Sequence, residues 1–180
     1  MSLANKISIL RILLVPGIIA SLVYYHPERD GLRFVALGLF LVGMATDALD
    51  GFIARTQNQQ SQLGTLLDPI ADKMLILGTL ISCSVIQGLP DAMRIPAWFN
   101  LLVITRDVLI VSGTVVIFAM QGQWRVEPSW LGKWATFAQM LVIPSVLLAL
   151  PAKTPLLIAA AALTVLSAIN YIRFGIRVLG

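Results

Sequence analysis

Six long apolar segments, separated by short polar stretches, constrain this chain more than any other feature. Each is close to the length of about 20 residues that a helix needs to cross a hydrocarbon core of ~30 Å. The segments are too long and continuous for barrel strands, which alternate over about 10 residues. They are Ile7–Tyr25, Leu32–Arg55, Leu63–Gln87, Ile95–Gln121, Leu131–Leu150 and Pro155–Val178. Since only helices or closed barrels satisfy the backbone in lipid, the sequence predicts an all-α membrane protein with six transmembrane helices.

Composition agrees with this fold class and restricts the partners. Of the 180 residues, 58% are hydrophobic and 12% are charged, whereas a soluble domain carries about 25% charged residues. Six spans fill the chain, so we expect one transmembrane domain over residues 1–180. The net charge of +4 comes without a long run of Lys and Arg, which favours membrane lipids over nucleic acid as the partner. Cys83 is the only cysteine, which excludes an intramolecular disulfide and argues against a zinc-cysteine site.

The basic residues predict the orientation of the bundle. The apolar N-terminal segment follows basic residues and lacks a convincing cleavage site, so we interpret it as a retained signal-anchor. Six spans place both termini on one side, and that side carries seven basic residues against four on the other. The seven are Lys6, Arg11, Arg55, Arg125, Lys133, Arg173 and Arg177. The positive-inside rule therefore predicts a bacterial-type inner-membrane protein with cytoplasmic termini.

Four acidic residues lie where the second and third segments approach the cytoplasmic side. Asp47 and Asp50 are three residues apart, and Asp68 and Asp72 are four apart, so each pair shares one helical face. A short loop joins the two helices, and we expect both pairs to converge at one depth. Four carboxylates in an apolar site need cations to neutralise them, and their hard oxygens suit Mg²⁺ or Mn²⁺. The pattern predicts two divalent ions about 3.5–4 Å apart, an arrangement used for phosphoryl displacement.

The neighbouring residues admit two interpretations each. Asp68 could simply cap a helix that starts at Pro69. Gly51 and Ala54 form a small-residue face that a nucleobase or ribose could approach, or that could serve helix packing instead. Arg55 lies one turn beyond the acids, where it could pair with a phosphate or act as a topology charge.

The acids and their neighbours form one motif, Asp47-x2-Asp50-Gly51-x2-Ala54-Arg55-x8-Gly64-x3-Asp68-x3-Asp72. This motif resembles the full signature of the CDP-alcohol phosphotransferase (CDP-alcohol phosphatidyltransferase) family. Asn5-x5-Arg11 also resembles that family's N-terminal segment, which lies at the membrane surface before the first span. With the six-span layout, the resemblance covers nearly the whole chain.

The resemblance implies an activity and a role for each residue of the motif. The enzyme would transfer a phosphatidyl group from CDP-diacylglycerol to an alcohol and release CMP, with its site facing the cytoplasm. The resemblance also implies a homodimer and two metal ions, with Asp72 as both a metal ligand and the general base. The implied metal ligands are Asp47, Asp50, Asp68 and Asp72, and the implied CDP-binding residues are Gly51, Ala54, Arg55 and Gly64.

Three cations of the later segments suggest where the acceptor binds. Arg106, Lys133 and Arg173 would suit a phosphate-bearing acceptor in a pocket beside Asp72. Alternatively, Lys133 and Arg173 could snorkel at span ends, and Arg106 could form a structural ion pair with Asp107.

Two branches of the family remain open from the residues. Thr105-Arg106-Asp107-Val108 and the segment 127–136 resemble both phosphatidylglycerophosphate synthases, which use glycerol 3-phosphate, and cardiolipin synthases, which use phosphatidylglycerol. The first branch often has Arg-Glu, a further arginine in that span and a second lysine. This chain has Asp107 and Ala135 instead, which suits the cardiolipin branch, whereas frequency among bacterial sequences favours glycerol 3-phosphate.

Other functions fit the sequence less well. Another polar alcohol, such as inositol phosphate or serine, would keep the same phosphatidyl transfer. A transporter usually places its site near the midplane and shows repeats or broken helices, whereas these acids cluster near one face and no repeat is visible. A non-catalytic scaffold would have no use for four acids and Arg55.

Overall fold

The computed structural model describes residues 3–57, 62–121 and 129–179, with the side chains of 7–46, 68–120 and 129–178. Within these residues the chain is entirely helical, without strands. No end differs by more than four residues from the expected segment, which confirms the all-α prediction. The helices are α1 (Leu3–Val23), η1 (Pro27–Arg29), α2 (Gly31–Gln57), α3 (Gln62–Val85), η2 (Asp91–Met93), α4 (Ala97–Gln121), α5 (Trp130–Leu147) and α6 (Lys153–Leu179).

The starts of α3 and α1 bear on two details of the sequence analysis. Helix α3 begins at Gln62, so Asp68 and Pro69 lie inside it, and the interpretation of Asp68 as a helix cap is wrong. Proline is tolerated at such positions in apolar helix bundles because neighbouring groups satisfy the freed carbonyl. Helix α1 begins at Leu3 and continues through Arg11 without a break, whereas its apolar stretch begins at Ile7. That residues before this stretch lie at the membrane interface stays a prediction.

Two of the described helical stretches are long and apolar enough to cross a membrane. They are Asp91–Met120 and Lys153–Val178, and two shorter apolar stretches cover Ile7–Val23 and Gly31–Thr46. Large apolar side chains also face outward, with Leu101, Val111 and Ile158 exposing 67%, 64% and 61% of their surface. Such an apolar exterior would be unfavourable in water and suits a lipid environment.

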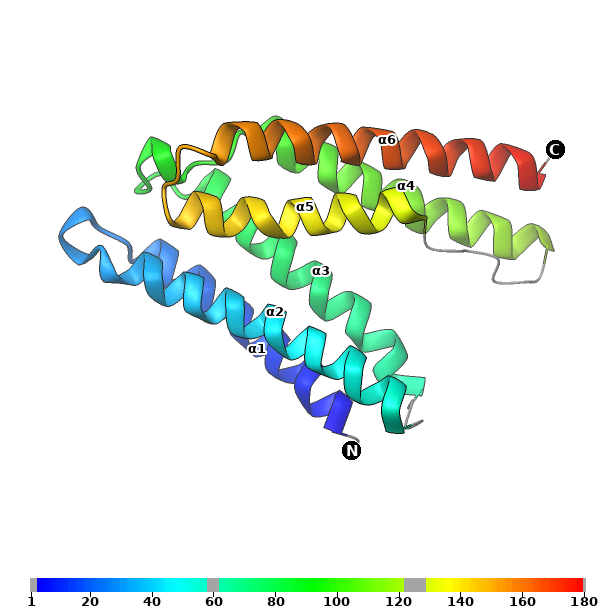
Figure 1. Ribbon diagram of the computed structural model, residues 1–180, viewed down its shortest axis with the longest axis horizontal. Helices are drawn as coiled ribbons and strands as arrows, with labels where there is room; N and C mark the ends of the chain where they lie inside the picture. The colour runs from blue at the N-terminus through cyan, green and yellow to red at the C-terminus, as the bar shows by residue number, and fades with distance from the viewer. Residues whose placement is uncertain (1–2, 58–61, 122–128, 180) are drawn as a thin grey trace. The chain divides into compact units, whose positions relative to one another are not determined.

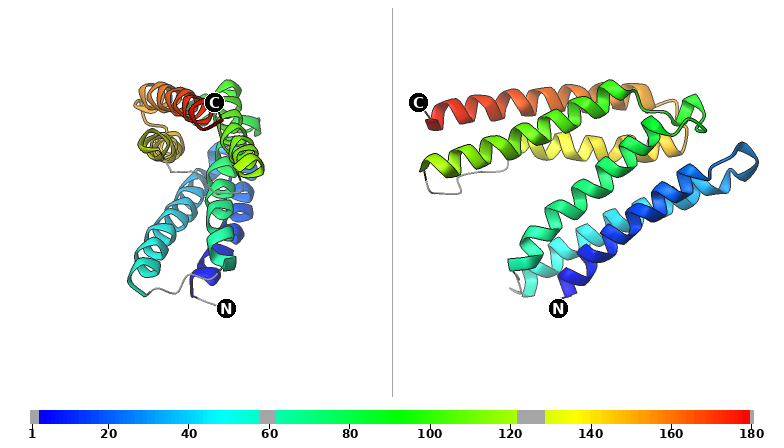
Figure 2. Two further views of the ribbon diagram at one scale, coloured as in Figure 1. Left: turned by 90° about the vertical axis from the view of Figure 1, so that its right-hand side faces the viewer. Right: turned by 180° about the vertical axis from the view of Figure 1, so that it is seen from behind.

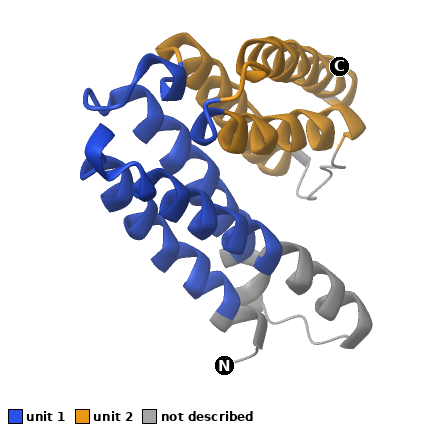
Figure 3. Cartoon of the chain, turned by 60° about the vertical axis from the view of Figure 1, so that its left-hand side comes forward, with its two compact units in different colours: residues 1–95, 146–149 blue, residues 96–145, 150–180 orange. Residues whose placement is uncertain are grey.

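The helices form two compact units, shown in different colours in Figure 3. Unit 1 comprises residues 1–95 and 146–149, and contains α1, α2 and α3. Unit 2 comprises residues 96–145 and 150–180, and contains α4, most of α5 and α6.

Helix α1 is the centre of packing in unit 1, because it lies along both α2 and α3 (Figures 1 and 2). Glycines allow these close approaches. A Cβ added to Gly17 would lie 3.2 Å from Leu39 of α2, and one added to Gly78 of α3 would lie 3.0 Å from Val15 of α1. Small residues permit helices to approach closely in membranes, so α1 holds α3 in a defined register.

In unit 2, α4 and α6 run in the same direction and pack together (Figure 1). The Tyr171 hydroxyl of α6 donates to the Ile110 carbonyl of α4 at 3.0 Å and lies 2.9 Å from Thr114 Oγ1. Its ring covers Gly113, where an added Cβ would come within 2.8 Å. The tyrosine therefore joins the two helices through both its ring and its hydroxyl.

Candidate active site

Helices α2 and α3 supply the four acids that the sequence singled out. Asp47 and Asp50 lie in the second half of α2, and Asp68 and Asp72 lie in the first half of α3. The structure describes the side chains of Asp68 and Asp72. The side chains of the remaining motif residues lie outside the described part: Asp47, Asp50, Gly51, Ala54, Arg55 and Gly64.

A close contact between α2 and α3 lies next to the acids. A Cβ added to Gly43 of α2 would lie only 2.6 Å from a methyl group of Leu75 of α3. Gly43 is four residues before Asp47, and Leu75 is three residues after Asp72. On each helix, the nearest acid is therefore about one helical turn from this contact along the chain. This register favours convergence of the two pairs, which stays a prediction.

Helix α1 contacts both described acids through polar side chains. The Ser8 hydroxyl donates to Oδ1 of Asp68, and Nη1 of Arg11 forms an ion pair with Oδ1 of Asp72. Nη2 of the same guanidinium lies 4.0 Å from Oδ1 of Asp68. The Arg11 guanidinium therefore pairs with Asp72 and approaches Asp68, both on the neighbouring helix.

Burial differs sharply between the two sides of this cluster. The Arg11 side chain is fully buried at 0% exposure, whereas the side chains of Asp68 and Asp72 expose 36% and 29%. The two carboxylates are contacted by α1 on one side and keep solvent-accessible surface on the other side. Hard, partly exposed carboxylate oxygens fit Mg²⁺ or Mn²⁺. The described residues contain no group of three or more metal-ligating side chains, since Asp47 and Asp50 lie outside them.

Ser8 and Arg11 are site residues that the sequence analysis missed. Arg11 was counted there as a topology charge, but a buried guanidinium paired with Asp72 does not report orientation. Without it, the basic residues number six against four, which still favours cytoplasmic termini. The available signal was an arginine three residues after a serine in an apolar helix, because intramembrane charges indicate function.

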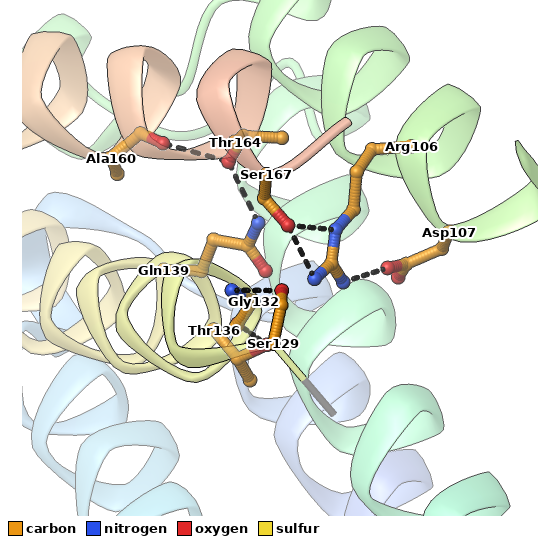
Figure 4. A network of polar contacts seen from close by, with 9 residues as sticks. All are labelled: Arg106, Asp107, Ser129, Gly132, Thr136, Gln139, Ala160, Thr164 and Ser167. Carbon is orange, nitrogen blue, oxygen red and sulfur yellow. Dashed lines mark hydrogen bonds and ion pairs between the residues drawn. The ribbon is translucent and has the colours of Figure 1, made fainter. Parts of the chain in front are cut away.

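Unit 2 contains a separate polar network around Arg106, shown in Figure 4. Nη1 of Arg106 donates to Asp107 at 2.8 Å, while Nε and Nη2 donate to the Ser167 hydroxyl of α6 at 3.3 and 3.0 Å. The two charged side chains expose only 8% and 12%. An added Cβ on Gly132 of α5 would come within 2.9 Å of Nη2. The guanidinium therefore occupies the space between three helices.

A second contact of this network lies between α5 and α6. The buried Gln139 amide of α5 donates to Thr164 of α6 at 3.0 Å, and Thr164 in turn donates to the Ala160 carbonyl at 2.7 Å (Figure 4). Hydrogen bonds between helices stabilise apolar bundles by roughly 0.6 to 2 kcal/mol each. The network thus fixes α5 against α6 beside Arg106.

The three predicted acceptor cations occupy different environments. Arg106 is buried, whereas Lys133 and Arg173 are exposed. The Lys133 ammonium lies 5.8 Å from the ring centroid of Trp130. Lys133 directly follows Gly132, which contacts the Arg106 guanidinium. Arg173 is six residues beyond Ser167 on α6, a rise of about 9 Å. Grouping of the three cations around one ligand stays a prediction.

The chain belongs to the CDP-alcohol phosphatidyltransferase family, whose model matches residues 1–166. The match extends over both units and confirms the resemblance inferred from the motif. Members of this family are membrane-associated transferases, and the family generally uses divalent metals.

Curated relatives bear the names of both branches considered above. A probable phosphatidylglycerophosphate synthase of Mycobacterium tuberculosis is 33% identical over 99% of this chain and 84% of its own length. A CDP-diacylglycerol–glycerol-3-phosphate 3-phosphatidyltransferase of Haemophilus influenzae is 30% identical, covering 93% and 89%. A putative cardiolipin synthase of M. tuberculosis is 30% identical, covering 82% and 65%.

Proposed function

We propose that this protein transfers the phosphatidyl group of CDP-diacylglycerol to the hydroxyl of a glycerol-type alcohol and releases CMP. The observation that supports this most directly is the pair Asp68 and Asp72, held by α1 on one side and accessible on the other. The family match and the names of the relatives support the same reaction.

The proposed cofactor is a pair of Mg²⁺ or Mn²⁺ ions held by the four acids. Asp47 and Asp50 would supply ligands from α2, and Asp68 and Asp72 would supply them from α3. When bound, two such ions neutralise the pyrophosphate and stabilise negative charge on the departing CMP. The partly exposed carboxylates of Asp68 and Asp72 fit this role.

The chemical step needs no covalent enzyme intermediate. The acceptor oxygen attacks the phosphorus that bears the diacylglycerol, and the bond from that phosphorus to the CMP oxygen breaks. Asp72 accepts the hydroxyl proton, which requires an approach of about 3 Å to the attacking oxygen. The CDP part of the donor is assigned to four residues of the motif: Gly51, Ala54, Arg55 and Gly64.

We favour glycerol 3-phosphate as the acceptor, giving phosphatidylglycerophosphate. The relatives named for this reaction match 99% and 93% of the chain. We assign the acceptor phosphate to Arg106, Lys133 and Arg173. Contacts with described residues use three of the five N–H donors of Arg106, so two donors are left for an anion. Lys133 and Arg173 are exposed and are proposed to supply the remaining positive charge.

Phosphatidylglycerol, giving cardiolipin, is the second candidate acceptor. Two observations favour it: Ala135 is fully buried where the first branch has a lysine, and Arg106 shares its charge with Asp107. A phosphodiester carries one negative charge, so it needs fewer cations than a phosphate monoester.

Product analysis tests the proposal. The purified protein is incubated with CDP-diacylglycerol, Mn²⁺ and each acceptor in turn, and the lipids are separated by mass. We expect phosphatidylglycerophosphate with glycerol 3-phosphate and metal, and no product after chelation. Cardiolipin alone would select the second acceptor. A phosphatidylinositol-type or phosphatidylserine product would refute both acceptors but preserve phosphatidyl transfer. Substrate uptake by proteoliposomes without CMP release would indicate a transporter.

The proposed setting is the inner membrane, with one six-span domain per chain, a cytoplasmic active site and a homodimeric assembly. The apolar helices and the excess of basic residues on one side support the orientation. Glu28, exposed after α1, would then face outward and Gln59 inward. A cysteine at Glu28 should react with an impermeant reagent in spheroplasts, whereas one at Gln59 should require a permeant reagent. The reverse labelling pattern would show that the proposed topology is inverted. For the assembly, finding only monomers after crosslinking in native membranes would exclude the homodimer.

A further inference from the structure

We propose that Ser8 and Arg11 are positioning residues that fix the Asp68 and Asp72 carboxylates for metal binding. Together they form what we call the α1 clamp. This inference rests on the proposed function, because it assigns the clamp to the metal site of the same reaction. It concerns residues outside the acidic motif, on a different helix.

The spacing of the clamp matches the spacing of the acids. Ser8 and Arg11 are three residues apart on α1, and Asp68 and Asp72 are four apart on α3, so each pair occupies one helical face. Ser8 contacts Asp68, and Arg11 contacts Asp72 and approaches Asp68. Each acid therefore has its own contact residue on α1, Ser8 for Asp68 and Arg11 for Asp72.

Packing beside the clamp keeps the two faces in register. Val15 lies one turn beyond Arg11 and would be 3.0 Å from a Cβ at Gly78, six residues beyond Asp72. Ser8 and Arg11 are both fully buried, at 0% exposure. Because neither side chain can move into solvent, they define where the carboxylates lie.

Both carboxylates remain partly exposed beside the clamp. The hydrogen bond and the ion pair fall on Oδ1 of Asp68 and Oδ1 of Asp72, and both acids keep about a third of their surface exposed. Hydrogen bonds to ligating carboxylates orient them, and their loss typically costs ten- to hundredfold in metal affinity. An arginine suits this position because its planar fork can reach two carboxylates at once.

Two other roles for Arg11 predict different results. If Arg11 only held α1 against α3, its removal would lower stability without changing metal affinity. If it only opposed the metal by like charge, its removal would tighten metal binding. The clamp predicts weaker binding, so the sign of the change separates the three roles.

The test measures Mn²⁺ affinity by electron paramagnetic resonance on purified, detergent-solubilised protein without substrates. Arg11→Met should weaken Mn²⁺ binding by roughly ten- to hundredfold. Ser8→Ala should have a smaller effect, and Arg11→Lys should restore part of the loss. The matched control is Ser21→Ala, which alters a buried serine of the same helix that bonds only to the Gly17 carbonyl. It should bind Mn²⁺ like the wild type.

Activity supplies a second readout. At saturating metal, Arg11→Met should lower kcat and leave the KM for CDP-diacylglycerol within about threefold, because the clamp acts on the acids and not on the donor. Size-exclusion profiles and helical circular dichroism verify folding. If Arg11→Met does not fold, the Mn²⁺ affinities of Ser8→Ala and Arg11→Lys test the proposal instead.

If the wild type is active but the folded clamp variants bind Mn²⁺ as tightly as the wild type or more tightly, the clamp proposal is wrong. The proposed function would be unaffected by that result. If the wild type neither bound Mn²⁺ nor transferred a phosphatidyl group, the proposed function would fail and the clamp with it.

Discussion

Each unit contains a buried arginine paired with an aspartate, but the two pairs differ in exposure. In unit 1, Arg11 is fully buried while its partner Asp72 exposes 29%. In unit 2, Arg106 and Asp107 expose only 8% and 12%. The first pair leaves a carboxylate open to a ligand, whereas the second encloses both charges. Exposure of the acidic partner therefore distinguishes the two ion pairs, because Asp72 is accessible to a ligand and Asp107 is largely enclosed.

The balance of charge also differs between the units. Arg11 forms an ion pair with Asp72 and lies 4.0 Å from Asp68, so two described carboxylates lie beside one guanidinium. Arg106 contacts one carboxylate and one hydroxyl, and two further cations of its unit, Lys133 and Arg173, are exposed. This difference agrees with the proposal that metal ions bind in the first unit and the acceptor phosphate in the second.

The largest expected effect tests the exposed acid of unit 1. Asp72→Asn removes the proposed base and one proposed metal ligand, so turnover should fall by at least roughly a hundredfold. Donor affinity should fall less, because the remaining ligands still engage the pyrophosphate. Steady-state kinetics with CDP-diacylglycerol separate kcat from KM. Near wild-type turnover in this variant would exclude Asp72 as the base and weaken the contrast between the units.

The next effect tests the enclosed pair of unit 2. Arg106→Ala removes the guanidinium that Asp107 contacts at 2.8 Å, which should lower stability by about 1.5–3 kcal/mol. The lost charged contact should also raise the acceptor's half-saturation concentration by roughly tenfold to a hundredfold, with little change for the donor. Thermal unfolding in detergent and acceptor titrations measure the two effects.

Ser167→Ala is the matched control for Arg106. It removes the hydroxyl that receives Nε and Nη2 but keeps the guanidinium, so stability should fall slightly while acceptor half-saturation stays near that of the wild type. Equal loss of donor and acceptor affinity in Arg106→Ala would restrict Arg106 to the structural ion pair with Asp107.

The smallest effect tests the helix contact beside the acids. A Cβ at Gly43 would lie 2.6 Å from Leu75, so Gly43→Ala should destabilise the protein by about 1–3 kcal/mol through overpacking. Gly38→Ala, on the same helix, meets nothing within 4 Å and should be neutral or stabilise by up to about 1 kcal/mol. Thermal unfolding of both variants compares them. Equal stabilities would show that α2 and α3 are not closely packed at Gly43.

The sequence by itself determined the helices and the class of protein. Long apolar segments can satisfy their backbone only as helices in lipid, which is why the predicted bounds agree with α1 to α6. The fixed spacing of the acidic motif indicated the family, because that chemistry depends on residues close together in the sequence. Local patterns also left open a helix cap at Asp68, since a proline often starts a helix, but here Pro69 lies inside one.

Only the tertiary structure decided which distant residues meet. Arg11 and Asp72 are 61 residues apart, and no local pattern states which face of α1 packs on α3. That choice follows from the fit of Val15 against Gly78, which depends on the shapes of both helices. In the same way, the sequence placed a charge at Arg106, but the packing of Gly132 and Ser167 around it enclosed that charge. Burial arises from all neighbours together, so it cannot be deduced from any one segment.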